Sequence, residues 1–213
     1  MSQLLRPTAA PRLPIAKEDY DARDQNEFKR VLDLYFKQLD NLTQGLLSPG
    51  GGKFLSSVYG AFSSSTTQSI TAANTPYVVV LSSADLTNGT SLASNKITVA
   101  QDGIYNCQFS LQFENTSTQI TDATVWLRKN GVDIPGTASI WGVTSSHGAI
   151  NGYTIGVANF FISLAANDYI EVIVAADATG LNIEAYAAAT SPFARPSIPS
   201  SVVTLAFVSA PLR

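Results

Sequence analysis

The sequence predicts a mainly β protein: a jelly-roll β-sandwich head, preceded by an extended arm and one α-helix. Three observations support this fold class. Short apolar segments separated by turn residues fill the chain from about residue 58 onward. Prolines crowd the first fourteen residues, and one stretch between these two regions has a helical apolar period.

Charge marks a boundary between two regions. Residues 1–45 carry 14 of the 29 charged side chains, although the chain has 213 residues. The segment Ser48-Pro49-Gly50-Gly51-Gly52 follows, and its composition is typical of a flexible linker. We therefore expect an extended Pro-rich attachment arm (1–20), an amphipathic helix (21–47), a Gly/Ser linker (48–57) and the jelly-roll head (58–213).

The arm cannot be helical at its proline-rich centre. Pro7, Pro11 and Pro14 remove backbone donors and favour an extended, polyproline-like path. Such a segment has no core of its own. It is either a loose tail or an arm that orders against a partner, and apolar residues such as Leu13 and Ile15 favour the arm.

The predicted helix begins near Asp21 or Asp24 and ends near Gly45, a plausible C-terminal cap. Its apolar residues step by 4, 3, 4, 3 and 4 along an a/d heptad seam: Phe28, Leu32, Tyr35, Leu39, Leu42 and Leu46. The stripe either packs on its own β domain or joins copies in a bundle, and the Gly-rich linker favours the bundle. The seam is too short to hold a coiled coil alone, so the head must assist.

The clearest strand of the head is Tyr105–Phe113, where apolar and polar residues alternate strictly. Cys107 lies on the apolar side, which predicts a small buried hydrophobe rather than a nucleophile. Seven further segments are predicted strands: 77–81, 96–100, 123–128, 154–164, 169–175, 182–187 and 202–208. The expected turns are Asp102-Gly103, Asn130-Gly131, Asn167-Asp168 and Thr179-Gly180.

Catalytic and metal-binding patterns are missing. One cysteine and one histidine exclude an intrachain disulfide, a thiolate cage and a multi-histidine site. His147 lies in a polar loop with no G-x-S-x-G motif, and Lys53 is not followed by Ser or Thr as a phosphate loop requires. We expect no enzyme, no cofactor and no metal. Paired head carboxylates that cleave a sugar are the one arrangement that sequence alone leaves open.

The charge and hydropathy pattern also limits partners. A net charge of −3 argues against nucleic acid as the main partner. No apolar run reaches the ~18 residues of a membrane span, and the start lacks a signal-peptide layout. We therefore expect a protein made in a cytoplasm, with no membrane partner.

Several head motifs resemble the trimeric jelly roll of the complement/tumour-necrosis-factor superfamily. Residues 102–105 are similar to its Gly-x-Tyr strand start, residues 125–131 to its strand ending in a Lys-Asn turn, and residues 160–172 to its paired apolar strands. Asn167 stands where that family usually has Gly, and Asn tolerates the left-handed conformation. Residues 202–210 resemble its closing strand. The resemblance implies a ten-strand jelly roll that forms a homotrimer through one aromatic-rich face.

The N-terminal region resembles the start of small tailed-bacteriophage virion proteins, over residues 11–21 and 31–41. Such proteins are head decoration (cement) proteins, head fibres or fibre-like tail components. The resemblance implies attachment to major capsid protein or another virion protein, and a place on the virion surface. The expected attachment residues are Pro11, Arg12, Leu13, Pro14 and Ile15.

A tail fibre or receptor-binding tip is the alternative to a capsid decoration protein. It would recognise the host surface, for instance a glycan, through exposed aromatic and polar residues. The candidates are Trp141 and Tyr153, which flank the loop 145–151, and His147 within it. For each aromatic, packing in the core is the competing interpretation.

Overall fold

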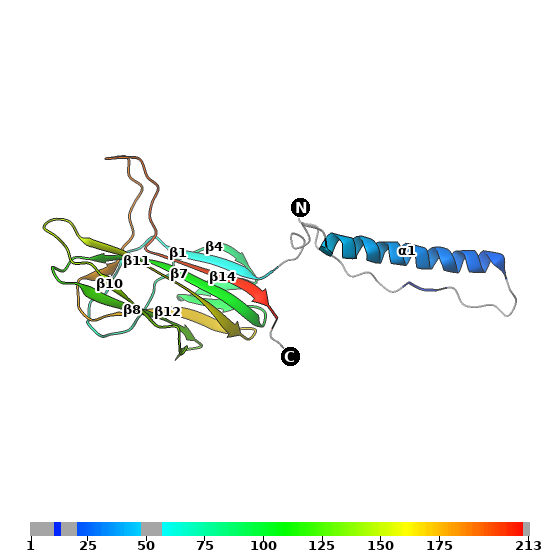
Figure 1. Cartoon of the computed structure of the whole chain (residues 1–213), viewed down its shortest axis with the longest axis horizontal. Coiled ribbons are helices and arrows are strands. Elements are labelled where there is room, and N and C mark those ends of the chain that lie inside the picture. Colours follow the sequence, from blue (N-terminus) through cyan, green and yellow to red (C-terminus); the bar gives the residue numbers. More distant parts are fainter. Residues whose placement is uncertain (1–10, 14–20, 48–56, 211–213) are drawn as a thin grey trace. The chain divides into compact units, whose positions relative to one another are not determined.

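The computed structural model describes residues 11–13, 21–47 and 57–210. The chain divides into two compact units, Met1–Ser56 and Ser57–Arg213. Within the first unit the described structure is mainly one helix, and the second unit is a β-sandwich (Figure 1). No helix among the described residues is long and apolar enough to cross a membrane.

The helix α1 spans Ala22–Leu47. Asp21 caps its start, because the backbone N–H of Arg23 donates to the Asp21 carboxylate at 2.8 Å. Of the two predicted starts, Asp21 is therefore the cap. The helix ends at Leu47, the last residue of the predicted segment 21–47, so Gly45 lies within its last turn and is not the C-terminal cap.

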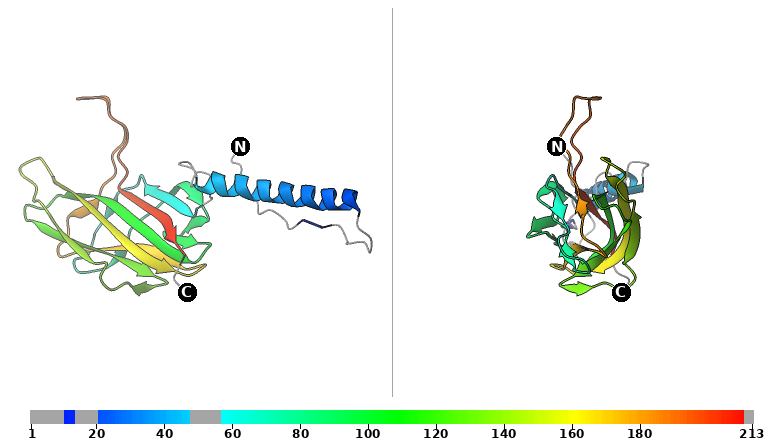
Figure 2. Two further views of the ribbon diagram at one scale, coloured as in Figure 1. Left: turned by 45° about the vertical axis from the view of Figure 1, so that its right-hand side comes forward. Right: turned by 90° about the vertical axis from the view of Figure 1, so that its left-hand side faces the viewer.

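The head is built from two antiparallel sheets packed face to face (Figures 1 and 2). The first sheet contains β1 (Tyr59–Ser64), β2 (Gln68–Ser69), β4 (Ser83–Asn88), β7 (Gly103–Asn115), β11 (Gly152–Leu164), β13 (Leu181–Ile183) and β14 (Ser201–Ser209). The second contains β3 (Tyr77–Val78), β5 (Thr90–Ala93), β6 (Lys96–Val99), β8 (Thr121–Lys129), β9 (Val132–Asp133), β10 (Ser139–Val143) and β12 (Tyr169–Ala176). This confirms the mainly β, jelly-roll sandwich fold.

The strand β7 organises the first sheet. Along its full length it pairs with β11 on one side. On its other side it pairs with two strands in succession, β14 opposite residues 104–111 and β13 opposite residues 113–115. Beyond these strands, β2 pairs with β13, while β1 and then β4 continue from β14.

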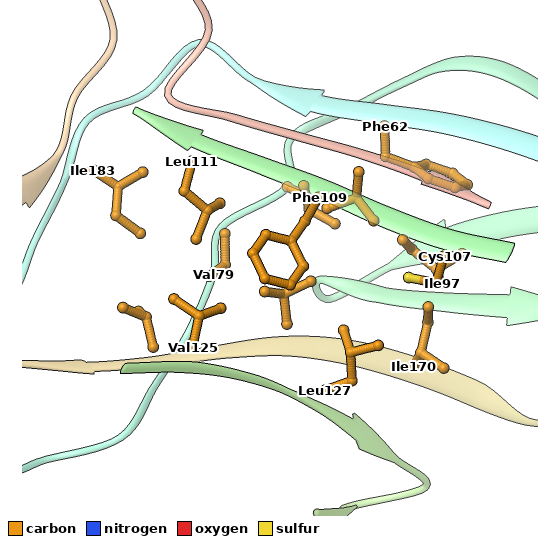
Figure 3. Close-up of a cluster of buried hydrophobic side chains, with 14 of the residues drawn as sticks. Phe62, Val79, Ile97, Cys107, Phe109, Leu111, Val125, Leu127, Ile170 and Ile183 are labelled. Atoms are coloured by element: carbon orange, nitrogen blue, oxygen red, sulfur yellow. The ribbon is translucent and has the colours of Figure 1, made fainter. Parts of the chain in front are cut away.

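The core lies between the two sheets and is filled by their inward residues (Figure 3). From β7 come Cys107, Phe109 and Leu111, which meet side chains such as Val125 and Leu127 of β8. Burial raises the pKa of the Cys107 thiol to about 12. The prediction that Cys107 is a small buried hydrophobe is confirmed.

Turn residues adopt the conformations that their types predict. Asn130 and Gly131 have φ angles of 50° and 82°, which form the tight β8–β9 hairpin. Asn167 has a φ of 69°, so it takes the left-handed conformation expected where glycine is usual.

Two predicted strands are shorter than expected. Only Tyr77 and Val78 of the segment 77–81 belong to a strand. The N–H groups of Val80 and Leu81 instead donate to side-chain oxygens of Gln68 and Asn95, at 2.9 and 3.0 Å. The predicted strand 182–187 is also wrong in extent, because β13 ends at Ile183 and the chain then leaves the sheet.

Candidate self-association surface

The strand β11 carries apolar side chains on both of its sides. Its inward residues include Gly156, whose missing Cβ leaves room for the rings of Phe113 and Trp141. The outward apolar residues form what we call the β11 row: Tyr153, Ile155, Val157 and Phe161. They are 49%, 57%, 46% and 67% exposed. The core of one copy does not need this row, so its apolar character requires another explanation.

The strands beside β11 extend this surface without adding charge, apart from one carboxylate. We call the outward sides of β11, β7, β14 and β1 the uncharged face. Besides the β11 row it includes Asn159, Ser163, Ile104, Asn106, Gln108, Ser110, Gln112, Val202, Thr204, Ala206, Tyr59, Ala61 and Ser63. The outward side of the second sheet differs, because it carries Asp122, Arg128 and Glu171. Depletion of charge is the usual mark of the centre of a protein interface.

Glu114 is the one ionisable carboxylate among these outward positions, and its partners lie within the same copy. It is 8% exposed. Asn151 Nδ2 and Tyr186 Oη donate to its Oε1 at 2.9 and 3.0 Å. Desolvation raises the pKa of Glu114, but hydrogen bonds from Asn151, Tyr186, Asn182 and Tyr153 outweigh it, so the pKa is lowered. The carboxylate can therefore stay ionised and partnered at the edge of an apolar surface.

Tyr186 links this carboxylate to the β11 row. Its ring meets the ring of Tyr153 edge to face, with centroids 6.5 Å apart. Arg195 lies over the Tyr186 ring, with its guanidinium carbon 5.7 Å from the ring centroid. Burial, followed by the hydrogen bonds with Tyr153 and Glu114, raises the pKa of Tyr186. The hydroxyl consequently remains a proton donor to Glu114.

The three residues proposed for surface recognition lie in different environments. Trp141 is half-buried and packs against Phe109, with ring centroids 5.9 Å apart. His147 is exposed in the loop between β10 and β11, and Tyr153 belongs to the β11 row. Of the three, only His147 and Tyr153 are exposed. Trp141 points between the sheets because alternation along the edge strand β10 turns Ile140 outward instead.

The described side chains of the α1 seam are half-buried or exposed. Leu32, Tyr35, Leu39 and Leu42 are half-buried and Phe28 is exposed, while Leu46 lies in the helix but its side chain is outside the described part. None of the described α1 side chains is buried. The prediction of a helix bundle stays a prediction.

The attachment arm is described only in part. Pro11 is half-buried, while Arg12 and Leu13 are exposed. The expected attachment residues Pro14 and Ile15 lie outside the described residues, as do residues 1–10 and all of the expected linker except Ser57.

Comparison with known proteins gives no family. No family model and no curated protein matches the chain. Among solved structures, the crystal structure of murine APRIL at pH 5.0 matches with 15% identity and a TM-score of 0.47, and that at pH 8.5 with 12% and 0.45. Each match covers 71% of this chain and 99% of the other. The fold described above rests on the strand order and pairing.

Proposed function

We propose that this protein is a non-enzymatic structural component of a tailed-bacteriophage particle. It is a capsid decoration (cement) protein or short head fibre that forms a homotrimer and attaches through its N-terminal segment. The observation that carries the proposal is the uncharged face with its β11 row. Residues 11–21 and 31–41 supply the virion setting through their resemblance to phage virion proteins.

The uncharged face supports self-association on energetic grounds. Fully burying a large apolar side chain stabilises by roughly 1.5–3 kcal/mol. The four residues of the β11 row are about half exposed, so covering them contributes on the order of 4 kcal/mol per copy. Association itself costs about 4–15 kcal/mol, so the row needs further contacts from the same face, the helix or another segment.

Three-fold symmetry is the arrangement that the remaining features favour. The head motifs resemble a trimeric superfamily, and the seam of α1 offers a second contact that symmetry would repeat. A trimer would also present three attachment arms at once. Three weak arms on neighbouring capsid subunits bind far more tightly than one, because the second and third contacts form at a high effective concentration.

A mechanical role agrees with the surroundings of Cys107 and His147, the two side chains considered as catalytic groups. Cys107 is fully buried with a pKa of about 12, so it is neither accessible nor a thiolate. His147 lies in an exposed loop, where the hydrogen bonds nearby join the backbones of His147 and Ile150. The protein would act by clamping subunits or presenting a surface.

Cryo-electron microscopy of particles that carry this protein, compared with particles that lack it, tests the location. We expect trimeric knobs or short fibres on the capsid, present only in the first sample. Density for the chain at the tail alone would overturn the capsid assignment.

A tail fibre or receptor-binding tip is the second candidate, and the position of His147 favours it. The loop 144–151 joins β10 to the start of β11, which pairs with Asn115. Tyr59, near the beginning of the described head, pairs with Ala206, and Ala206 pairs with Asn106. Asn106 lies near the start of β7 and Asn115 at its end, so Tyr59 and the loop are at opposite ends of the sheet. A recognition loop at the end of the sheet opposite Tyr59, where the chain enters the head, would suit contact with a host surface. Binding of the purified chain to intact host cells would support this candidate, and loss of binding in His147→Ala with Tyr153→Ala would locate the site.

A further inference from the structure

The first sheet contains an interruption that a sandwich core does not require. β13 and β14 pair with the same side of β7, one after the other, so they occupy the place of a single strand. Both ends of the interruption meet one residue of β7: Glu184 N–H donates to Gln112 O at 2.7 Å, and Gln112 N–H donates to Ser200 O at 2.9 Å. The residues between, 185–199, leave the sheet and return at the same point. We call them the projecting hairpin.

The projecting hairpin stands on the uncharged face. It is flanked by β7 on one side and on the other by the β1–β2 connection, where Ala185 N–H donates to Thr67 Oγ1 at 3.2 Å. Because the packed core fills the inward side of the sheet, the hairpin leaves the sheet on its outward side. Tyr186, at its base, contacts the outward side chains Glu114 and Tyr153. In both figures the projecting hairpin, drawn in brown, extends away from the two sheets (Figures 1 and 2).

The projecting hairpin has little to hold it in place. Two antiparallel bridges join its halves, Tyr186 with Ile198 and Ala189 with Arg195. An isolated two-stranded hairpin is at best marginally stable in water. Its single charge, Arg195, is used internally, because Nη1 donates to the carbonyls of Ala187 and Pro196 at 3.0 and 3.2 Å.

The outer part of the projecting hairpin is apolar or small. Residues 187–194 read Ala-Ala-Ala-Thr-Ser-Pro-Phe-Ala, and Phe193 is 67% exposed. Tyr186 at the base of the hairpin meets Tyr153, but Ile155, Val157 and Phe161 of the β11 row stay exposed with the hairpin present. Two apolar surfaces on the same side of the head are thus left without a partner in a single copy.

We propose that the projecting hairpin is a clasp between copies, which lies on the uncharged face of a neighbouring copy and packs Phe193 against its β11 row. This rests on the proposed self-association through the uncharged face. If that face is covered by another copy, a segment that stands on it must lie against that copy. The clasp also supplies the further contact that the β11 row needs.

Two hairpin variants of the full chain test the clasp through the concentration at which the trimer dissociates. Phe193→Asp should raise this concentration about tenfold or more, as loss of a central aromatic contact does. Replacing residues 187–197 by Asn-Gly, which joins the bridged Tyr186 and Ile198 by a tight turn, should raise it further. Val132→Asp is the matched control, because Val132 is 70% exposed on β9 of the second sheet. Unchanged dissociation in both hairpin variants would overturn the clasp.

Phe161→Asp in the β11 row separates the clasp from the proposed function. If it dissociates the trimer and the hairpin variants do not, self-association through the face stands and the clasp falls. If the unaltered chain is a monomer, both fall.

Thiol labelling gives a second measurement that does not depend on stability. In Ala194→Cys, which keeps Phe193, the new thiol should react at least about tenfold more slowly in the trimer than the thiol of Val132→Cys. Cys107 is buried and should stay silent in both. Equal reaction rates in the trimer would mean that the hairpin is free for another partner, which overturns the clasp.

Discussion

Phe161 is the most exposed side chain of the β11 row, and its substitution is the sharpest test at the scale of one residue. Phe161→Asp should convert the trimer to monomers at micromolar concentration, because three carboxylates would have to be buried at the interface. The head should remain folded, since the side chain points away from the core. Sedimentation velocity and circular dichroism measure the two effects.

Ile140→Asp is the matched control for Phe161→Asp. Ile140 is 69% exposed, almost the same as Phe161, but it lies on the second sheet. This variant should stay trimeric. Dissociation of both variants would mean that added charge, and not the uncharged face, is responsible.

Glu114 predicts a pH dependence of head stability. Because its pKa is lowered in the folded protein, its ionised form stabilises the fold above the unfolded pKa of about 4.3, and this contribution is lost as pH falls through the lower folded value. Glu114→Gln should therefore lower Tm at pH 7 by a few degrees and reduce the fall in Tm between about pH 5 and pH 3. Identical Tm profiles for the two proteins would show that these hydrogen bonds do not stabilise the ionised carboxylate.

The β11 row shows why the site was harder to predict than the strand that carries it. Along β11 the outward Tyr153, Ile155 and Val157 are larger and more apolar than inward residues such as Gly152 and Gly156. Apolar/polar alternation alone would place Tyr153, Ile155 and Val157 in the core. Gly156 is explained only when the rings of Phe113 and Trp141, from other strands, are seen to fill the space beside it, and Gly152 when the backbone of Thr144 is seen to do the same.

At the scale of elements, β7 was predictable because one of its faces is fully buried and the other is polar. The edge strands β4 and β5 were not, since their residues are mostly exposed and rich in Ser, Thr and Asn, so no alternation marks them. The predicted strand 182–187 extends into only the first three residues of the projecting hairpin, and no prediction covers the remainder of it. Its Ala- and Pro-rich sequence does not reveal that it leaves the sheet, because that depends on the pairing of β13 and β14 with β7.

Leu39→Asp tests the helix α1 as an element. Placing a charge in the seam should weaken association of the helix region and lower the helical signal, while the head trimer persists. Gln38→Asp is the matched control, because it adds the same charge at an exposed neighbouring position. Circular dichroism at 222 nm over a range of concentrations reads out the helix. Equal signals from the two variants would favour a helix that does not bundle.

At the scale of the whole molecule, the predicted particle role depends on a chain that assembles with itself. The uncharged face, the projecting hairpin and the seam of α1 are apolar or uncharged surfaces that one copy leaves exposed or only half covered. A closed three-fold assembly would cover them all and bring three attachment arms together. The central claim is therefore the oligomeric state.

Sedimentation equilibrium of the purified full chain tests that claim most directly. The account predicts a single species of about three times 22.6 kDa at micromolar concentration. A species of 22.6 kDa under the same conditions would contradict it.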